Sequence, residues 1–332
     1  MNLEIQPEVI LKTYWGFAGS AALSVALDLD LFTAIHQRHN SVEKISRHLK
    51  LPLRSTRVLM DALVGLGLLS KSKLAYLLTP ESKTYLVKSE PHYLGNIFHR
   101  MNENFKHWPH LNEVVRSGKH INGVDYSTKV QFYSQLARDI FPTSYASSIQ
   151  TAKKLGIGKS LKSLKMLDVA CGSGAWGIAF ALADKTLKVT AQDYPEVLEV
   201  TNQYIKRFRL DSQYNFLSGD LQNIDFAKQH YDIICLGHIC HCLGENDARK
   251  LIKKSFEALR PGGRLLIGEF VPNDLKTADT VSLLFALQML LDTPSGDVFS
   301  LKEFKRWLAL TGFKKVSALK VLYPASVVVA VK

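Results

Sequence analysis

The chain has no apolar run long enough to cross a membrane. Its longest candidate, VSLLFALQMLL at residues 281–291, has 11 residues, whereas a spanning helix needs roughly 18 or more. The first residues, MNLEIQPEV, lack the basic and apolar segments of a secretory signal. Only four cysteines are present, and there are no repeats or low-complexity linkers. These absences argue against membrane and disulfide-rich classes, and we expect a cytoplasmic protein with reduced thiols and no membrane partner.

The chain has ample material for a folded core. Of its 332 residues, 46% are hydrophobic, which suits about two globular domains. Within it, the segment LKMLDVACGSGAWG at residues 164–177 runs from an apolar strand into Asp168 and then into a turn with Gly172, Gly174 and Gly177. Such a turn lets the backbone approach a ligand, and the following helix offers free N–H groups. It predicts a nucleotide-cofactor site, although GSGAWG also fits the dinucleotide fingerprint and does not choose the cofactor alone.

Further strand ends follow in order along the chain. VTAQDYP places Asp193 at the end of a second strand, and FLSGDLQN places Asp220 after a third. YDIICLGHICHCL predicts a fourth strand, LRPGGRLLIGEFVP a turn into a fifth, and TGFKKVSALKVLYPASVVVAVK an antiparallel pair. The series resembles the class I S-adenosylmethionine (SAM) methyltransferases. That resemblance implies an α/β Rossmann-like fold with a mostly parallel seven-stranded sheet over residues 150–332.

The resemblance also assigns the cofactor residues. They are Asp168, Gly172 and Gly174 at the amino-acid end of SAM, Asp193 at the ribose hydroxyls, and Asp220 with Leu221 at the adenine. A carboxylate pairs well with two vicinal hydroxyls or with an exocyclic amine. Ala170 stands where the family has its first glycine, a small departure.

The first 90 residues predict helices followed by a short wing. Ser41 is a predicted N-cap, Pro52 starts a further helix, and residues 70–86 are expected to form two short strands. The apolar face expected for the helix after Pro52 consists of Val58, Leu59, Ala62, Leu63 and Leu66. This is a winged-helix pattern, and with a net charge of +12 it raises a second class of function, a DNA-binding regulator.

Closer inspection disfavours DNA as a partner. A recognition helix needs several long polar side chains, but the candidate helix supplies Arg54 and Arg57 at its start and then becomes apolar. The positive charge is dispersed in pairs such as Lys153-Lys154. We therefore expect no nucleic-acid partner and a helix surface that packs against another chain or domain.

A winged-helix region followed by a SAM domain resembles the small-molecule O-methyltransferases that include caffeate, polyketide and hydroxyindole enzymes. The resemblance implies a dimerisation domain at 1–90, a helical connection at 91–149 that contributes to the substrate pocket, and the SAM domain at 150–332. It further implies a homodimer, SAM as cofactor, and methyl transfer to a hydroxyl of a small aromatic or polyketide-like metabolite. A C-methyltransferase acting on an enolisable carbon and a non-catalytic SAM-fold regulator stay open as alternatives.

A histidine after the fourth strand is the family's general base. In the segment LGHICHCLGEND, residues 236–247, the resemblance aligns His241 with that base. A phenol of pKa about 10 is mostly protonated at neutral pH, and an imidazole of pKa about 6.5 can accept its proton. Glu269, at the end of the fifth strand, matches the acid that orients the histidine.

Two positions depart from the family's pattern around this base. The aspartate and tryptophan that usually follow the histidine are Cys242 and Leu243. The second orienting acid aligns with Val298, and its neighbour Asp297 would point the opposite way on an extended segment.

The cluster His238, Cys240, His241 and Cys242 raises the question of a metal. Four ligands within five consecutive residues cannot converge on one tetrahedral centre, so we expect no catalytic metal and interpret His238 as a packed core residue. A site made from both histidines and Glu269 stays open, and it would indicate C-methylation through a polarised enolate.

The acceptor pocket is expected between the connection and the cofactor domain. Flat aromatic acceptors favour apolar and aromatic walls, although each candidate could equally be an ordinary core residue. The candidates are Phe105, Trp108, Phe141, Phe285 and Met289.

Overall fold

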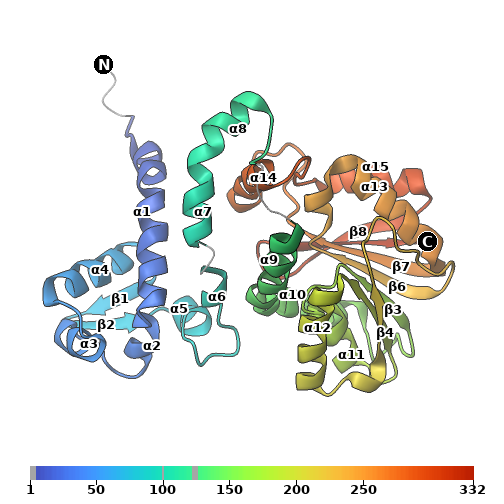
Figure 1. Cartoon of the computed structure of the whole chain (residues 1–332). Helices are drawn as coiled ribbons and strands as arrows, with labels where there is room; N and C mark the ends of the chain where they lie inside the picture. The colour runs from blue at the N-terminus through green and yellow to red at the C-terminus, as the bar shows by residue number, and fades with distance from the viewer. Residues whose placement is uncertain (1–4, 99–100, 122–125) are drawn as a thin grey trace. The chain divides into compact units, whose positions relative to one another are not determined.

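The computed structural model describes residues 5–98, 101–121 and 126–332 (Figure 1). Its backbone packing divides the chain into two compact units, Met1–Phe105 and Lys106–Lys332, which are described separately here. The segment 91–149, expected as a connection, is shared between them.

The first unit is mainly helical and carries the expected two-stranded wing. The wing is shorter than predicted, because residues 80–85 form a helix that starts at Pro80 and is capped by Thr79. Its helices are α1 (Glu8–Asp28), α2 (Leu31–His36), α3 (Val42–Leu49), α4 (Leu53–Gly65), α5 (Pro80–Tyr85) and α6 (Gly95–Phe98), with α7 (Met101–His107) ending just beyond it. The wing pairs β1 (Leu69–Ser72) with β2 (Ala75–Leu78) in antiparallel register. Ser41 caps α3 as predicted, because its side chain accepts a hydrogen bond from the N–H of Lys44 at 3.3 Å.

The wing is tied to α4 by one carboxylate. Asp61 accepts hydrogen bonds from Tyr76 Oη at 2.6 Å and from Lys71 Nζ at 2.8 Å. Hydrogen bonds from Lys71 and Tyr76 lower the pKa of Asp61 to about 2. The hairpin therefore stays fixed to the helix over the neutral pH range.

The predicted apolar face of α4 is partly wrong. The buried residues are Thr56, Met60 and Leu63, one face at helical spacing that packs into the unit's core. By contrast, Val58 and Leu66 are 50% and 48% exposed. The two residues lie on a second apolar face, which the core of this unit does not cover.

Helix α1 also leaves apolar side chains exposed. Along its first half, exposed fractions reach 77% at Val9, 60% at Trp15 and 62% at Phe17. Only Ser24, Ala26 and Leu27, near its end, are buried.

The second unit contains a seven-stranded sheet with the order β5-β4-β3-β6-β7-β9-β8 (Figure 1). The first five strands in this order, β5, β4, β3, β6 and β7, run parallel to one another. Strand β9 is antiparallel to both β7 and β8. The strands are β3 (Lys165–Val169), β4 (Lys188–Asp193), β5 (Tyr214–Ser218), β6 (Tyr231–Gly237), β7 (Leu259–Glu269), β8 (Lys314–Lys320) and β9 (Ser326–Val331). The predicted mostly parallel sheet with an antiparallel closing pair is confirmed.

Helices cover both faces of this sheet. Apolar residues of α10, α11 and α12 pack on one face and those of α13 and α15 on the other. The helices of the unit are η1 (Trp108–His110), α8 (Leu111–Ser117), α9 (Tyr126–Asp139), α10 (Phe141–Leu155), α11 (Ala175–Ala183), α12 (Pro195–Phe208), η2 (Asp211–Gln213), α13 (Cys240–Ala258), α14 (Thr280–Asp292) and α15 (Leu301–Thr311). None of the helices described in either unit combines the length and apolar content needed to span a bilayer.

The predicted fourth strand is shorter than expected. It ends at Gly237, and helix α13 begins at Cys240, so the rest of the segment 231–243 is turn and helix. Cys240 and Cys242 therefore lie on a helix and not at strand positions. This early helix start places His241 in the first turn of α13, at the edge where the parallel strands end.

Candidate functional site

The glycine turn after β3 is built from left-handed backbone conformations. Gly172 has φ +57° and Gly174 has φ +74°, and Gly174 is the N-cap of α11. A Cβ at Gly174 would come within 2.8 Å of the Thr201 side chain. Ala170 also has a positive φ, +47°, at the position where the family has glycine. The turn exposes the N-terminus of α11 at the edge where the strands end, as a cofactor site requires.

Asp168 lies at the end of β3 and is completely buried. Its Oδ2 accepts a hydrogen bond from the Gly177 N–H at 2.9 Å, whereas Oδ1 has no hydrogen-bond partner among the described residues. Burial raises the pKa of Asp168 to about 7 against the opposing effect of the Gly177 N–H. A buried carboxylate oxygen without a partner is costly, which marks this position as one prepared for a ligand.

Asp193 ends β4 beside the glycine turn. Its Oδ2 accepts a hydrogen bond from the Gly172 N–H at 2.8 Å, and its Oδ1 accepts one from the Tyr194 N–H at 2.8 Å. Burial raises the pKa of Asp193 to about 6, and the two N–H groups oppose that shift. The structure thus brings the predicted ribose acid into direct contact with the predicted glycine turn.

Asp220 and Leu221 lie in the loop after β5. The Oδ1 of Asp220 accepts a hydrogen bond from the Gln222 N–H at 2.8 Å. Lys254 of α13 holds this loop, because its Nζ donates to the carbonyl oxygens of Leu221, at 3.0 Å, and Ile224. Sequence reasoning missed Lys254, since its partners are backbone atoms thirty or more residues away.

His241 and Glu269 form a buried pair. The Nδ1 of His241 lies 2.7 Å from Oε2 of Glu269, and the His241 N–H donates to Oε1 at 3.2 Å. His241 is 8% exposed and Glu269 2%. One carboxylate therefore fixes both the ring and the backbone of the predicted base.

The electrostatics of this pair are reciprocal. Burial disfavours charge on His241, but the adjacent Glu269 carboxylate outweighs burial and raises the pKa of the imidazole well above its usual value. Burial acts to raise the pKa of Glu269, but His241 outweighs it and lowers that pKa. Glu269 therefore stabilises the ring of His241 when that ring carries a proton on both nitrogens.

His238 lies near the same carboxylate oxygen. Its Nδ1 is 4.0 Å from Oε2 of Glu269, and its backbone has φ +60°. Burial lowers the pKa of His238, Glu269 opposes that shift, and His241 adds to it. The interpretation of His238 as a packed core residue gave it no charged neighbour, whereas the structure places it near Glu269, as in the alternative site of both histidines and this acid.

The segment 295–298 supports His241 through its backbone. The Asp297 N–H donates to the His241 carbonyl at 3.0 Å, and a Cβ at Gly296 would lie 2.5 Å from the same oxygen. The Asp297 carboxylate instead accepts a hydrogen bond from the Val298 N–H at 2.7 Å and lies 3.9 Å from Lys276. Asp297 thus contacts His241 through its main chain, and its carboxylate pairs with Lys276.

Aromatic rings surround the histidine pair. The Phe285 ring of α14 meets the His241 ring edge-on at 4.9 Å, and Phe270 lies 4.4 Å from Phe285 and 5.3 Å from His238 between ring centres. Met289, one turn beyond Phe285, is 7% exposed. Phe270 was missed in the sequence, although it directly follows Glu269.

The other predicted pocket residues lie elsewhere. Trp108 donates a hydrogen bond from Nε1 to Gln288 of α14 at 2.9 Å, which places it beside the helix that carries Phe285. The Phe141 ring stacks on Tyr204 at 4.1 Å and on Tyr145 at 5.1 Å, so its described ring contacts belong to the packing of α10 against α12. Phe105 belongs to the first unit and is 40% exposed.

Tyr133 of α9, which is 38% exposed, is close enough to Cys242 and Asp193 for their charges to affect its pKa. Burial raises its pKa to about 12, and nearby Cys242, Tyr194 and Asp193 act in the same direction. The sequence offered no signal for this residue, because the aromatic content of α9 does not reveal which ring faces the strand ends.

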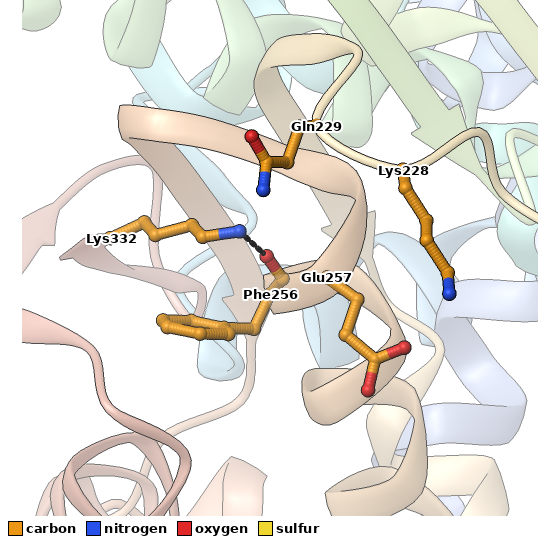
Figure 2. A pocket seen from close by; sticks show the side chains of 5 residues that line it. All are labelled: Lys228, Gln229, Phe256, Glu257 and Lys332. Carbon is orange, nitrogen blue, oxygen red and sulfur yellow. Dashed lines mark hydrogen bonds between the residues drawn. The ribbon is translucent and has the colours of Figure 1, made fainter.

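A hollow lies at the opposite edge of the sheet from the histidine pair (Figure 2). It is lined by Lys228, Gln229, Phe256, Glu257 and Lys332, and Lys332 Nζ donates to the carbonyl oxygens of Phe256 and Leu259. These residues flank the starts of β6 and β7 and include none of the predicted site residues.

The glycine turn, the acids at successive strand ends and the sheet order are features of the methyltransferase class of α/β folds. Comparison with known proteins agrees: the O-methyltransferase domain matches residues 108–314, and the O-methyltransferase dimerisation domain matches residues 11–88. The chain therefore belongs to the SAM-dependent O-methyltransferase family.

Individual relatives extend this similarity over nearly the whole chain. The tetracenomycin polyketide synthesis 8-O-methyl transferase TcmO of Streptomyces glaucescens is 26% identical, over 98% of this chain and 97% of that protein. An O-methyltransferase structure from Nostoc punctiforme superposes with a TM-score of 0.87 at 24% identity, covering 99% of both chains. Human N-acetylserotonin methyltransferase, solved with SAM, superposes with a TM-score of 0.80 at 21% identity, covering 100% of this chain and 99% of that one.

Proposed function

We propose that the protein transfers a methyl group from SAM to a hydroxyl of a small aromatic or polyketide-like metabolite, with His241 as the general base. The buried pair of His241 and Glu269, at the edge where the parallel strands end, is the observation that carries this proposal. The similarity to TcmO, whose name describes 8-O-methylation in polyketide synthesis, supports the class of acceptor.

The residues present fit SAM. The unpartnered Oδ1 of Asp168 and the N–H groups of the glycine turn suit the charged amino-acid end, and Asp193 suits two ribose hydroxyls. Asp220 and Leu221 suit the adenine. When bound, SAM supplies a methyl group on a positively charged sulfur, a good leaving group for in-line displacement.

His241 makes the acceptor nucleophilic. In its neutral form, with Nδ1–H donating to Glu269, His241 would accept the hydroxyl proton of the acceptor at the other ring nitrogen, Nε2. Glu269 then stabilises the positive charge that forms on the ring. Phe270 and Phe285 are the walls against which a flat acceptor can stack.

Labelled methyl transfer to a panel of phenols tests this proposal. His241→Ala should lower the transfer rate about 10²–10⁴-fold, while His230→Asn, at the opposite edge of the sheet, should leave it unchanged. An unchanged rate for His241→Ala would contradict the base assignment. Label recovered on carbon in place of oxygen would instead favour C-methylation.

We also propose that the chain works as a homodimer through its first unit. The exposed apolar residues of α1 and the second face of α4 provide a surface that a second copy would cover. Trp15→Glu should convert dimer to monomer in sedimentation experiments. Leu310→Glu, which alters a residue 71% exposed on α15, should leave the oligomeric state unchanged. A monomeric wild type at micromolar concentration would contradict the proposal.

A further inference from the structure

We propose that His238, His241 and Glu269 form a binding site for a divalent ion of the zinc type, and that this ion and base catalysis exclude one another. The donor atoms of all three side chains lie within 4.8 Å of one another. Two imidazole nitrogens and one carboxylate oxygen are a donor set that zinc accepts, with a fourth position left for water.

The geometry is close to that of a coordinated ion. The Nδ1 atoms of both histidines face the same oxygen, Oε2 of Glu269, at 2.7 Å for His241 and 4.0 Å for His238. Ligand bonds to zinc of about 2.0–2.2 Å place tetrahedral ligand atoms roughly 3.3–3.6 Å apart. An ion among these atoms therefore needs a small opening of the His241–Glu269 contact and a closer approach of His238.

His238 is the residue that the base pair alone does not explain. Its ring makes no hydrogen bond within the part of the chain that the structure describes, and its side chain is 15% exposed. Its backbone adopts φ +60°, a conformation that costs a residue other than glycine energy and that gathers at functional sites. The His238 imidazole is therefore partly buried, has no hydrogen-bond partner among the described residues, and lies beside a Glu269 carboxylate that already contacts His241.

The neighbouring thiols are not part of the set. Cys240, the first residue of α13, is completely buried in the core. The side chain of Cys242 hydrogen-bonds His241, but it does not belong to the group of three residues whose ligand atoms all lie within 4.8 Å of one another. A site of nitrogen and oxygen donors is therefore distinguishable from a thiolate site by measurement.

A bound ion would prevent His241 from acting as a general base. Coordination through Nδ1 leaves the proton of a neutral imidazole on Nε2, so His241 could no longer accept one from the acceptor hydroxyl. This consequence rests on the proposed function, whereas binding of the ion does not.

Binding is tested first, with zinc chloride and a chromophoric chelator as competitor. The wild type should bind zinc, and His238→Asn should bind it at least about 10-fold more weakly. Asparagine tolerates the left-handed backbone, and His238→Ala is the second variant in case asparagine retains a contact. Equal affinity in wild type and both folded variants would overturn the site.

A matched control and a spectrum identify the ligands. Cys242→Ser should leave zinc affinity unchanged, and the cobalt(II) form of the wild type should lack a thiolate charge-transfer band. Loss of binding in Cys242→Ser, or a thiolate band, would overturn the assignment to His238 and Glu269.

The activity measurement then tests the exclusion. The zinc concentration for half-inhibition should be at least about 10-fold higher in His238→Asn than in the wild type, each relative to its own zinc-free rate. Binding without inhibition would overturn the exclusion and leave the site. If no acceptor is methylated by any variant, the proposed function fails while the binding result still decides the site.

Discussion

The two ends of the candidate site are built from different parts of the chain. At the cofactor end, the strand ends of β3, β4 and β5, backbone conformation does most of the work: Gly172 and Gly174 adopt positive φ, and Asp193 bonds to a glycine N–H. At the base end, the strand ends of β6 and β7 with the start of α13, side chains meet: His241 contacts Glu269 and Phe285. We therefore expect substitutions at the cofactor end to change the affinity for the cofactor alone. Substitutions at the base end should change the rate of methyl transfer alone.

Apart from loss of His241 itself, Glu269→Gln should give the largest effect at the base end. The amide keeps the volume but not the charge that stabilises the protonated ring, so the transfer rate should fall roughly 10- to 100-fold. Affinity for S-adenosylhomocysteine (SAH), the product form of the cofactor, should stay the same. Glu257→Gln, near the opposite edge of the sheet, is the matched control. Loss of SAH affinity in Glu269→Gln would contradict the separation of cofactor affinity from transfer rate.

Acid should weaken the cofactor end. Asp193 has a pKa of about 6 because burial raises it. Below that pH its protonated form accepts ribose hydroxyls less well, so SAH affinity should fall by up to about tenfold per pH unit on acidification and level off above pH ~7. Calorimetry from pH 5 to 8 measures this. In Asp193→Asn the remaining slope reports Asp168, and an unchanged slope would contradict the role of Asp193.

Lys254→Met should give the smallest effect, again at the cofactor end. The change removes the hydrogen bonds that hold the carbonyls of Leu221 and Ile224. A hydrogen bond contributes about 0.5–1.5 kcal/mol, so SAH affinity should fall roughly 2- to 10-fold. The rate at saturating SAM should not change. Lys253→Met, one residue earlier and exposed, serves as control, and equal effects of the two variants would sink the role of Lys254.

The fold of the cofactor end was predictable because its information is local. Each strand and its terminal acid are contiguous in sequence, and a glycine turn has few alternatives to its backbone path. The strands ending before Asp193 and Asp220 are confirmed, and the predicted turn adopts the required left-handed conformations. Residues that hold this end from a distance, such as Lys254, carry no local signal.

The base end was predicted less completely for a physical reason. Its contacts join β6, α13, β7 and α14, so which rings meet depends on packing between distant segments. The sequence identified His241 and Glu269 through a family pattern, and the structure brings them together. The sequence-based prediction did not identify Phe270 or the position of His238. It also extended the fourth strand through residues that form the start of α13.

Helix α4 of the first unit was also predicted incompletely, because contacts between distant segments decide which of its apolar residues are buried. Hydrophobic periodicity on α4 correctly gave Leu63, but it merged a buried face with the exposed residues Val58 and Leu66. Periodicity reports that a residue is apolar, and it does not report whether the same chain or another one covers it.

Crossed measurement of two variants tests the central claim most directly. SAH affinity by calorimetry and methyl transfer to one phenolic acceptor would be measured for Asp193→Ala and His241→Ala alongside the wild type. The account predicts that Asp193→Ala loses SAH affinity about 10- to 100-fold, while His241→Ala keeps that affinity and loses the transfer rate. Retained SAH affinity in Asp193→Ala, or a retained rate in His241→Ala, would contradict it.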